Sequence, residues 1–525
     1  YEIALPLRPN GPLSQFSVNQ IGFYAQDVWN VTPKLSLTYG ARVDAPMLPT
    51  KPDANPALAA VQFTHVNLGR TGSTDVANTA DFTTAPLWSP RFGFNYDVKG
   101  DQTTLIRGGI GVFSGRPPYV WVSNAYANSG LTQATLICNG SAIPTFTPVL
   151  ASQPTQCAGG AGANPPTPSI VYFDRGFNFP QTMRAALGLD HQLPWGMVLT
   201  VDLLYTRTLN QFYLNDVNLQ GVQRQETGEG GRLQYGVAGT PNGSGIASVI
   251  GPKRISSAFA DVIRQSNSSG DNSYSATVQV NKRFSNHISF NAGYTSAKTK
   301  DRQCMTSSIA HSNLQFAVLQ GPLDNRPLET SCFDVPNKIA LTGLFDLPLG
   351  IQASVIYTGF SDTPFTYTVN NDANGDGLPG NDPIYVPRDS TDITLKNPAD
   401  WATLNSYINS DQCLSSARGT LLQRNTCRGP WQSFLNARVT KVIPTMRGQS
   451  VEFSVDIFNL PNLISSSWGV VRSTTGFENQ SILNQTGYDV ANARGQYTLM
   501  NTKSLNAVQA GSSRYRLLLS GRYTF

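Results

Sequence analysis

The chain has 525 residues, of which 40% are hydrophobic and 14% are charged, and it carries a formal net charge of +5. Both fractions are lower than in an ordinary soluble domain, which has roughly 45–50% apolar and about 25% charged residues. The small charge, without a basic cluster, argues against nucleic-acid binding, and we find no run of about 18 apolar residues that would form a transmembrane helix.

The first residues, YEIALPLRPNGPL, do not have the basic, apolar and small-residue layout of a signal peptide. We therefore expect a mature or truncated chain whose export signal, if it has one, lies outside this sequence. The rest of the composition is rich in Gly, Ser, Thr, Asn, Gln and Pro, with 20 Tyr and 25 Phe. This composition is typical of short strands, tight turns and long polar loops.

Six pairs of alternating segments follow one another along the chain, each pair joined by a short connection with hairpin-turn residues. These connections are NVTPK (30–34), DVKGDQ (97–102), QLPWG (192–196), FSNH (284–287), DLPLG (346–350) and IPTMRGQ (443–449). Long connections separate the pairs, over about 46–87, 115–179, 210–270, 300–333, 362–431 and 460–512. This alternation is typical of a bacterial outer-membrane barrel, which has short periplasmic turns and long extracellular loops.

The paired segments have the period of two that is expected of strands with two different faces. In residues 35–44, Leu, Leu, Tyr, Ala and Val alternate with Ser, Thr, Gly, Arg and Asp, and residues 274–283, 288–295 and 451–457 alternate in the same way. Tyrosines near the strand ends fit an interfacial aromatic girdle. A soluble sandwich could also alternate, but it does not explain the alternation of short and long connections.

The last strand, YRLLLSGRYTF (515–525), has an aromatic and apolar face opposite a face with two arginines. Together with the twelve strands of the hairpins it gives about thirteen. Single-chain bacterial barrels have an even number of antiparallel strands, and closure of an odd set would make the two end strands parallel. We therefore expect residues 1–525 to be the C-terminal portion of a larger transmembrane antiparallel β-barrel whose first strands are not in this sequence.

Charged residues on the polar faces of these strands are expected to face a wet lumen and to form solvated networks, some of which could contact cargo. They are Arg42, Arg107, Asp202, Arg283, Glu452, Asp456, Arg516 and Arg522.

Six cysteines lie in the long connections and outside the proposed strands. We predict three disulfides, each within one loop, because each would close a loop of about 15–30 residues; the pairs are Cys138 with Cys157, Cys304 with Cys332, and Cys413 with Cys427. Zinc sites are the alternative, but no CxxC spacing is present and the histidines are scattered at His65, His191, His287 and His311. Disulfides indicate an extracytoplasmic setting.

The stretch NNDANGDGLPGNDP (370–383) is the strongest candidate for a ligand site. Asp372, Asn374 and Asp376 have the alternating oxygen ligands of a calcium loop, and Gly377 stands where the sharp turn requires glycine. The glutamate expected at position twelve is absent, because Pro383 is there, and Asp382 could substitute. The alternative is a polar turn without metal.

The sequence offers no catalytic constellation. GGIGVFSG (108–115) superficially resembles a phosphate-binding loop, but it continues an alternating strand and no helix follows. We see no nucleophile elbow and no metalloprotease helix, so we do not expect an enzyme.

Several segments together resemble the barrel of TonB-dependent outer-membrane receptors, in particular the large Oar-like group. They are FYAQDVWNVTPKLSLTYGARVD (23–44), SPRFGFNYDV (89–98), LIRGGIGVFSGRPP (105–118), FDVPNKIALTGLFDLPLGIQASVIYTGFSDTPFT (333–366), NDANGDGLPGNDP, DIFNLPN (456–462) and the final RYTF. The resemblance covers nearly all the strands and fades in the long loops.

The resemblance implies a 22-stranded barrel in the outer membrane, plugged by an N-terminal domain, which takes up a bulky ligand using an inner-membrane energising complex. About nine strands would then precede Tyr1, and the plug and coupling box would also lie outside this sequence. A transporter is therefore the first functional hypothesis. The alternatives are a surface binding or scaffold protein anchored by its barrel, and a passive porin-like channel. The sequence does not identify the ligand.

Overall fold

The computed structural model describes residues 1–8, 14–64, 74–80, 84–116, 118–138, 140–160, 166–248, 250–284, 287–472, 479–500 and 507–525. The described part of the chain is mainly β-structure with antiparallel pairing. None of its helices is long and apolar enough to cross a membrane.

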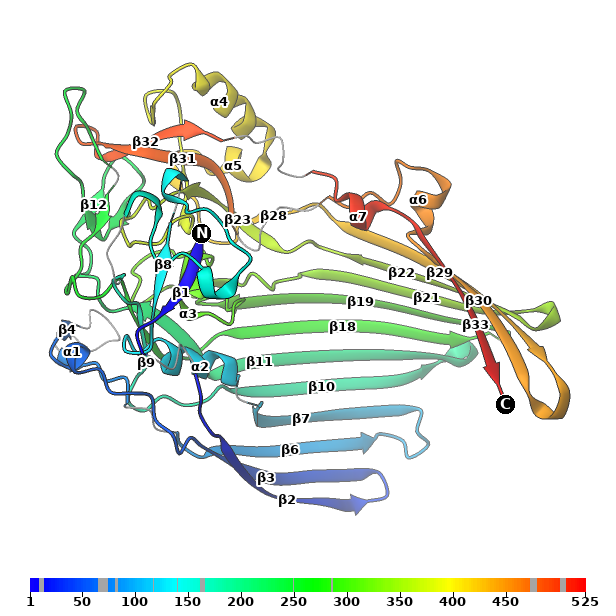
Figure 1. Cartoon of the computed structure of the whole chain (residues 1–525). Coiled ribbons are helices and arrows are strands. Elements are labelled where there is room, and N and C mark those ends of the chain that lie inside the picture. Colours follow the sequence, from blue (N-terminus) through cyan, green and yellow to red (C-terminus); the bar gives the residue numbers. More distant parts are fainter. Residues whose placement is uncertain are drawn as a thin grey trace.

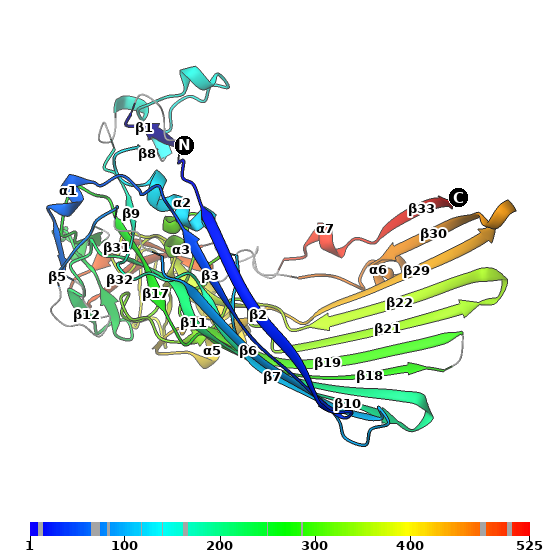
Figure 2. The same cartoon turned by 90° about the horizontal axis from the view of Figure 1, so that it is seen from below.

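One large sheet organises the molecule, and its central path follows the chain in order, with every neighbour antiparallel (Figure 1). The path consists of β2 (Asn19–Thr32), β3 (Leu35–Met47), β6 (Leu87–Asp97), β7 (Thr104–Ser114), β10 (Gln181–Leu193), β11 (Met197–Asp216), β18 (Asn272–Arg283), β19 (Ile288–Asp301), β21 (Asn337–Leu347), β22 (Ile351–Phe360), β29 (Gln432–Pro444), β30 (Ser450–Phe458) and β33 (Arg516–Thr524). Figure 2 shows this sheet as an open trough, with β2 and β33 at its two rims.

The six predicted hairpins are confirmed, because the two strands that flank each short connection are neighbours on this path. Ser285 and Asn286 of the FSNH connection lie outside the described residues. The PWG and PLG turns, Pro194–Gly196 and Pro348–Gly350, have the same geometry. In each, the middle residue and the glycine have positive φ, 63° and 69° in the first and 67° and 70° in the second. Proline fixes its own φ and glycine accepts a positive one without strain, so these residues fix the turn.

The large sheet has one apolar and one polar face. A single cross-strand row of the apolar face runs through seven neighbouring strands, and the pairing of each member with the next is in register: Tyr96, Ile106, Leu189, Val201, Val278, Tyr294 and Ile339. The next row along, on the polar face, contains Asn95, Arg107, Gly188, Asp202, Thr277, Thr295 and Lys338. Successive side chains of a strand point to opposite faces, so the two rows cannot mix.

The apolar face is not covered by another layer of the described chain. Val278 is 44% exposed, Phe453 55% and Leu519 76%. A contiguous apolar surface of this extent on a curved sheet is the surface that a barrel presents to lipid.

The long connections fold into a second body at one end of the large sheet, which we call the cap. Its main sheet consists of β15 (Ile246–Ala247), β23 (Pro364–Asn370), β24 (Asp382–Pro383), β26 (Thr394–Leu395), β28 (Cys427–Arg428), β31 (Asn479–Asp489) and β32 (Arg494–Leu499). Smaller strands pair as β1 (Glu2–Pro6) with β8 (Gln133–Ile137), β4 (Gln62–Thr64) with β5 (Thr74–Val76), β12 (Arg224–Glu226) with β13 (Arg232–Gln234), β14 (Gly236–Val237) with β16 (Gly251–Pro252), and β25 (Tyr385–Val386) with β27 (Thr420–Leu421). The cap extends the large sheet through β9 (Ile170–Phe173), β17 (Val262–Ser268) and β20 (Glu329–Thr330).

Short helices complete the chain: α1 (Pro56–Ala59), α2 (Tyr119–Ala127), α3 (Ala310–Gln315), α4 (Asp400–Ser410), α5 (Gln412–Ser416), α6 (Leu460–Ile464) and α7 (Ala510–Ser513). The α4 and α5 helices cover the main cap sheet, and Leu404 and Ile408 join Ile482 and Leu483 in its core. The cap therefore has hydrophobic cores of its own, which the polar composition of the long connections did not predict.

The three predicted disulfides are confirmed. Cys138 pairs with Cys157, Cys304 with Cys332, and Cys413 with Cys427, with Cα–Cα distances of 5.5, 6.1 and 5.5 Å. Since all six thiols are consumed, a zinc site at cysteine is excluded. All three disulfides lie in the cap, where they tie its loops together.

Candidate functional site

The polar face of the large sheet carries several ion pairs. Arg107 donates from Nε to Asp190 Oδ2 at 3.0 Å and from Nη2 to Asp202 Oδ1 at 2.7 Å. Thr200 completes the group by donating to Asp190 at 2.7 Å. The predicted residues Arg107 and Asp202 are therefore brought together, and Asp190 is a partner that the sequence reading missed.

A second ion pair lies two strands away on the same face. Arg42 binds Asp44 through two hydrogen bonds of 2.8 and 2.6 Å, and Asp44 is buried. A cavity of about 610 Å³ next to this pair is also lined by Tyr24, Arg91 and Arg116. Three arginines and one carboxylate give this cavity an excess of positive charge, which suits an anionic group.

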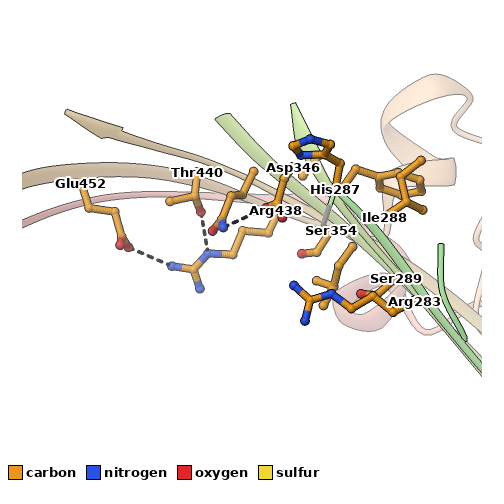
Figure 3. A pocket seen from close by; sticks show the side chains of 13 residues that line it. Arg283, His287, Ile288, Ser289, Asp346, Ser354, Arg438, Thr440 and Glu452 are labelled. Atoms are coloured by element: carbon orange, nitrogen blue, oxygen red, sulfur yellow. Dashed lines mark hydrogen bonds and ion pairs between the residues drawn. The ribbon is translucent and has the colours of Figure 1, made fainter. Parts of the chain in front are cut away.

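A third group of charged side chains lies on β29 and β30, the two strands of the last hairpin. Arg438 approaches Glu452 at 3.9 Å and Asp456 at 3.6 Å, and it donates to Ser454 at 3.1 Å. Figure 3 shows this arginine directed along the wall toward Glu452 and Thr440. The group borders a cavity of about 700 Å³ whose other lining side chains include Arg283, His287, Ser289, Asp346 and Ser354. Arg283 and Glu452 thus line the same cavity from different strands, whereas Arg438 was not among the predicted site residues.

The two C-terminal arginines lie at the rim. Arg522 is directly opposite Glu452 in the β30–β33 register, and Arg516 is opposite Phe458, over whose ring its guanidinium lies at 5.6 Å. Both belong to the polar face. Cross-strand pairs of opposite charge such as Glu452 and Arg522 stabilise a sheet modestly.

Buried polar contacts join cap loops that are far apart in the sequence. Glu229 accepts hydrogen bonds from Arg232 Nε at 2.9 Å, from the Gly495 amide at 2.8 Å and from the Tyr497 hydroxyl at 2.5 Å. Burial and the neighbouring carboxylate raise the pKa of Tyr497, so it stays a donor. Only the folded structure shows this group, since its members show no sequence pattern.

A second buried carboxyl makes the same connection. The Tyr488 hydroxyl donates to Glu226 at 2.5 Å, and Arg224 donates to the other oxygen at 2.7 Å. Burial raises the pKa of Glu226 although both partners favour its charged form. Desolvation therefore outweighs the two hydrogen bonds at this site.

The predicted calcium-loop residues lie together in the cap, and all four side chains are buried: Asp372, Asn374, Asp376 and Asp382. Within the described ranges, no set of three or more His, Cys, Asp and Glu side chains is arranged as a metal site. Calcium binding by this loop stays a prediction.

The histidines remain scattered. His191 Nδ1 lies 2.9 Å from Thr104 Oγ1, and His311 Nδ1 lies 2.7 Å from Asp261 Oδ2. His65 lies outside the described residues. Residues 108–114 belong to β7, as their alternation predicted, so the segment 108–115 is not a phosphate-binding loop.

Comparison with known proteins gives one family and several distant structures. Residues 8–482 match a protein family described as "Outer membrane beta barrel domain". A search of curated protein sequences found no match.

Among solved structures, the outer membrane transporter YddB from Escherichia coli is 11% identical, with 84% of this chain and 41% of that chain covered and a TM-score of 0.43. The FrpB iron transporter from Neisseria meningitidis is 8% identical, with 97% and 46% covered and a TM-score of 0.41. The ferric-catecholate import receptor Fiu from E. coli is 11% identical, with 97% and 45% covered and a TM-score of 0.39. The chain spans less than half the length of each of these proteins.

Proposed function

The chain belongs to the outer membrane beta barrel domain family and is a protein of the outer membrane, and from this premise we propose that it forms part of a TonB-dependent transporter for a bulky ligand. Its thirteen-strand path would be one part of the barrel wall, and the cap would bind the ligand outside the cell. Transport would be driven through an inner-membrane energising complex, by segments outside this sequence. Membership of the Oar-like group is part of the same proposal and rests on the resemblance of the barrel segments.

The observation that carries the proposal is the chemical difference between the two faces of the sheet. The row through Val278 is apolar, and the neighbouring row carries the Arg107–Asp202 pair. A wall with hydrocarbon on one side and water on the other needs this arrangement. Fixed ion pairs hold the inner charges in place without closing the lumen, because partly exposed pairs keep contact with water.

The open rims support a larger barrel. Among the described strands, β2 pairs only with β3 and β33 only with β30, so each leaves one edge of backbone N–H and C=O groups without a partner. In lipid each such group costs several kcal/mol, roughly. The path has thirteen strands, so β2 and β33 run parallel, and an odd number of further strands would close an antiparallel barrel. The 22-strand total stays a prediction.

A surface binding or scaffold protein is the second candidate, and the packed cap favours it. The cap has its own cores, three disulfides and buried polar contacts between loops, so it could bind another macromolecule with the barrel as anchor. A porin-like channel has no comparable support.

The ligand is unidentified, so the test uses the growth medium itself as the probe. We would compare depletion of medium components by three strains: the parent, a deletion of this gene, and a deletion of the inner-membrane energising complex. The transporter proposal expects a shared set of components that both deletions leave in the medium. Equal depletion by the parent and the gene deletion, with loss of surface attachment in the deletion, would instead support the scaffold. Ion conductance of the purified protein in planar bilayers, without energy coupling, would support the channel.

A further inference from the structure

The backbone of the loop 372–378 is wrapped around oxygen-bearing side chains. Asp372 Oδ1 accepts hydrogen bonds from the amides of Gly375 and Asp376 at 2.7 and 3.1 Å, and Oδ2 accepts one from Gly377 at 2.7 Å. Asn374 Oδ1 accepts the Asp376 amide at 2.8 Å, and Asp376 Oδ1 accepts the Leu378 amide at 2.8 Å. These side chains occupy positions 1, 3 and 5 of a calcium loop, and Gly377, with φ of 95°, occupies position 6.

The carboxylates of this loop are buried with little compensating charge. Asp376 and Asp382 are each 1% exposed. Arg232 lies 4.0 Å from Asp382 and is already bound to Glu229 at 2.9 Å. Arg254 is also close to the loop, but it is paired with Asp216. Buried carboxylates without a counter-charge are strongly unfavourable, and a bound cation would remove that cost.

A separate observation points to a ligand at the same place. Asn381 is completely buried and its Oδ1 has no hydrogen-bond partner. Its Nδ2 makes two long contacts, 3.5 Å to Asp376 Oδ2 and 3.4 Å to Leu314 O. The two ends of an amide are assigned from such contacts, so a half-turn of the Asn381 amide would exchange Nδ2 for Oδ1 beside Asp376 Oδ2 and Leu314 O. In that orientation the buried amide oxygen and the Asp376 carboxylate oxygen would be a pair of ligands for a hard cation.

We propose that this loop binds one calcium ion, with side-chain oxygens from Asp372, Asn374, Asp376 and Asn381. Two carboxylates and two amide oxygens suit calcium, which takes oxygen ligands of mixed charge. A site with two carboxylates also agrees with the lack of any cluster of three acidic, cysteine or histidine ligands among the described residues. The site is independent of what the protein transports.

The structure changes the role that the sequence reading gave to Asp382. Its Oδ2 accepts the amides of Ala373 and Asn374 at 2.8 and 3.1 Å, and Arg232 approaches the other oxygen. Asp382 is therefore a positioning residue that closes the loop behind the ligands. The sequence-based prediction did not include Asn381, because the burial of Asn381 depends on contact with Leu314, which lies 67 residues away in the sequence.

Calcium at this site would hold two cap loops together. The Asn374 carbonyl accepts the Tyr235 amide at 2.7 Å, and the Ala373 carbonyl accepts Gln234 Nε2 at 2.8 Å. Arg232 donates to the Pro383 carbonyl at 2.8 Å. Residues 232–236 pack against the loop 372–383, so ordering this loop would also hold them in place. Since the ion would bind the folded loop, calcium should raise the stability of the cap.

The direct test is a calcium titration of the full-length protein, extracted from outer membranes in detergent and stripped with EDTA. Calorimetry should show one site, with a dissociation constant on the order of 10⁻⁴–10⁻³ M or tighter. Terbium should bind the same site and be sensitised by Tyr235. Asp376→Asn should weaken binding at least about tenfold. Asp389→Asn is the matched control, because Asp389 also closes a turn, with Thr391, but on the surface; it should bind calcium like the wild type.

A second variant keeps the proposal testable if Asp376→Asn fails to reach the outer membrane. Asn381→Asp replaces the amide by a second carboxylate beside Asp376. If a cation binds there, this variant should be less stable than wild type in EDTA and should bind calcium more tightly. If Asn381 only donates hydrogen bonds to Asp376, the variant should be less stable with and without calcium. That result, or a wild-type protein that binds no calcium at millimolar concentration, would overturn the proposal.

Discussion

Arg107 and Asp202 form a 2.7 Å hydrogen bond across a strand that lies between their own two strands. The intervening residue is Gly188, which is paired in register with both. A Cβ atom added there would lie 2.7 Å from Arg107 Cζ and 2.8 Å from Asp202 Oδ1. Gly22 lies opposite Asp44 on the neighbouring strand, and a Cβ atom added there would lie 2.6 Å from Arg42 Nη2 and 2.8 Å from Asp44 Oδ1. Glycines of the polar face thus leave room for the ion pairs of the wall.

Gly188→Val is therefore expected to push the Arg107 guanidinium out of its place and to lower the free energy of unfolding by about 1–3 kcal/mol. Gly293→Val is the matched control, because Gly293 lies on the same face and its added Cβ would meet no atom closer than 3.9 Å. Urea unfolding of the two variants in detergent, followed by heat-modifiable gel mobility, measures the difference. Equal stability of the two variants would contradict the role given to Gly188.

The Cys413–Cys427 disulfide should stabilise the cap without affecting the wall. The bond joins α5 to β28 over 14 residues of sequence, and such a loop closure is worth about 3 kcal/mol. Replacement of both cysteines by serine should make the α4–α5 segment sensitive to protease while the large sheet stays folded. The Cys138–Cys157 double serine variant is the control, since that bond lies in another cluster. Loss of the wall in the first variant would show that cap and wall fold as one unit.

Glu226 should make the cap less stable as the pH rises. Burial raises its pKa in the folded state above the ordinary value, so the protonated form is favoured by folding. The contribution to stability is complete below the unfolded pKa of about 4.3 and is lost as the pH rises through the raised folded value. Glu226→Gln should flatten this part of the stability profile, measured by thermal unfolding of the cap between pH 4 and 8, whereas Glu329→Gln should leave it unchanged. A wild-type profile that rises with pH in this window, and that Glu226→Gln does not alter, would be the opposite result.

The hairpins could be predicted because their signals are local. The period of two, the PWG and PLG turns and the loop 372–377 each depend on a few neighbouring residues. The cap could not be predicted in this way. Its sheet pairs β23 with β31, and the Glu229–Tyr497 contact joins residues 268 apart in the sequence.

The sequence indicates which charges share the polar face, but not which of them pair. Alternation places Arg107 and Asp202 on one face, but their pairing depends on the order of the strands and on Gly188. Asp190 and Arg438 alternate in the same way and were overlooked, because nothing local distinguishes a charge that forms a pair from one that does not.

The orientation of the wall can be measured with one pair of variants. All six native cysteines are in disulfides, so Val278→Cys and Thr277→Cys each add a single free thiol on opposite faces of β18. A nitroxide attached to each, in protein reconstituted into bilayers, reports its surroundings by collision with oxygen or with a water-soluble nickel complex. We predict that the label at 278 is relaxed by oxygen and the label at 277 by nickel. Relaxation of the label at 278 by nickel, or shielding of both labels in a dry core, would contradict a wall between lipid and water.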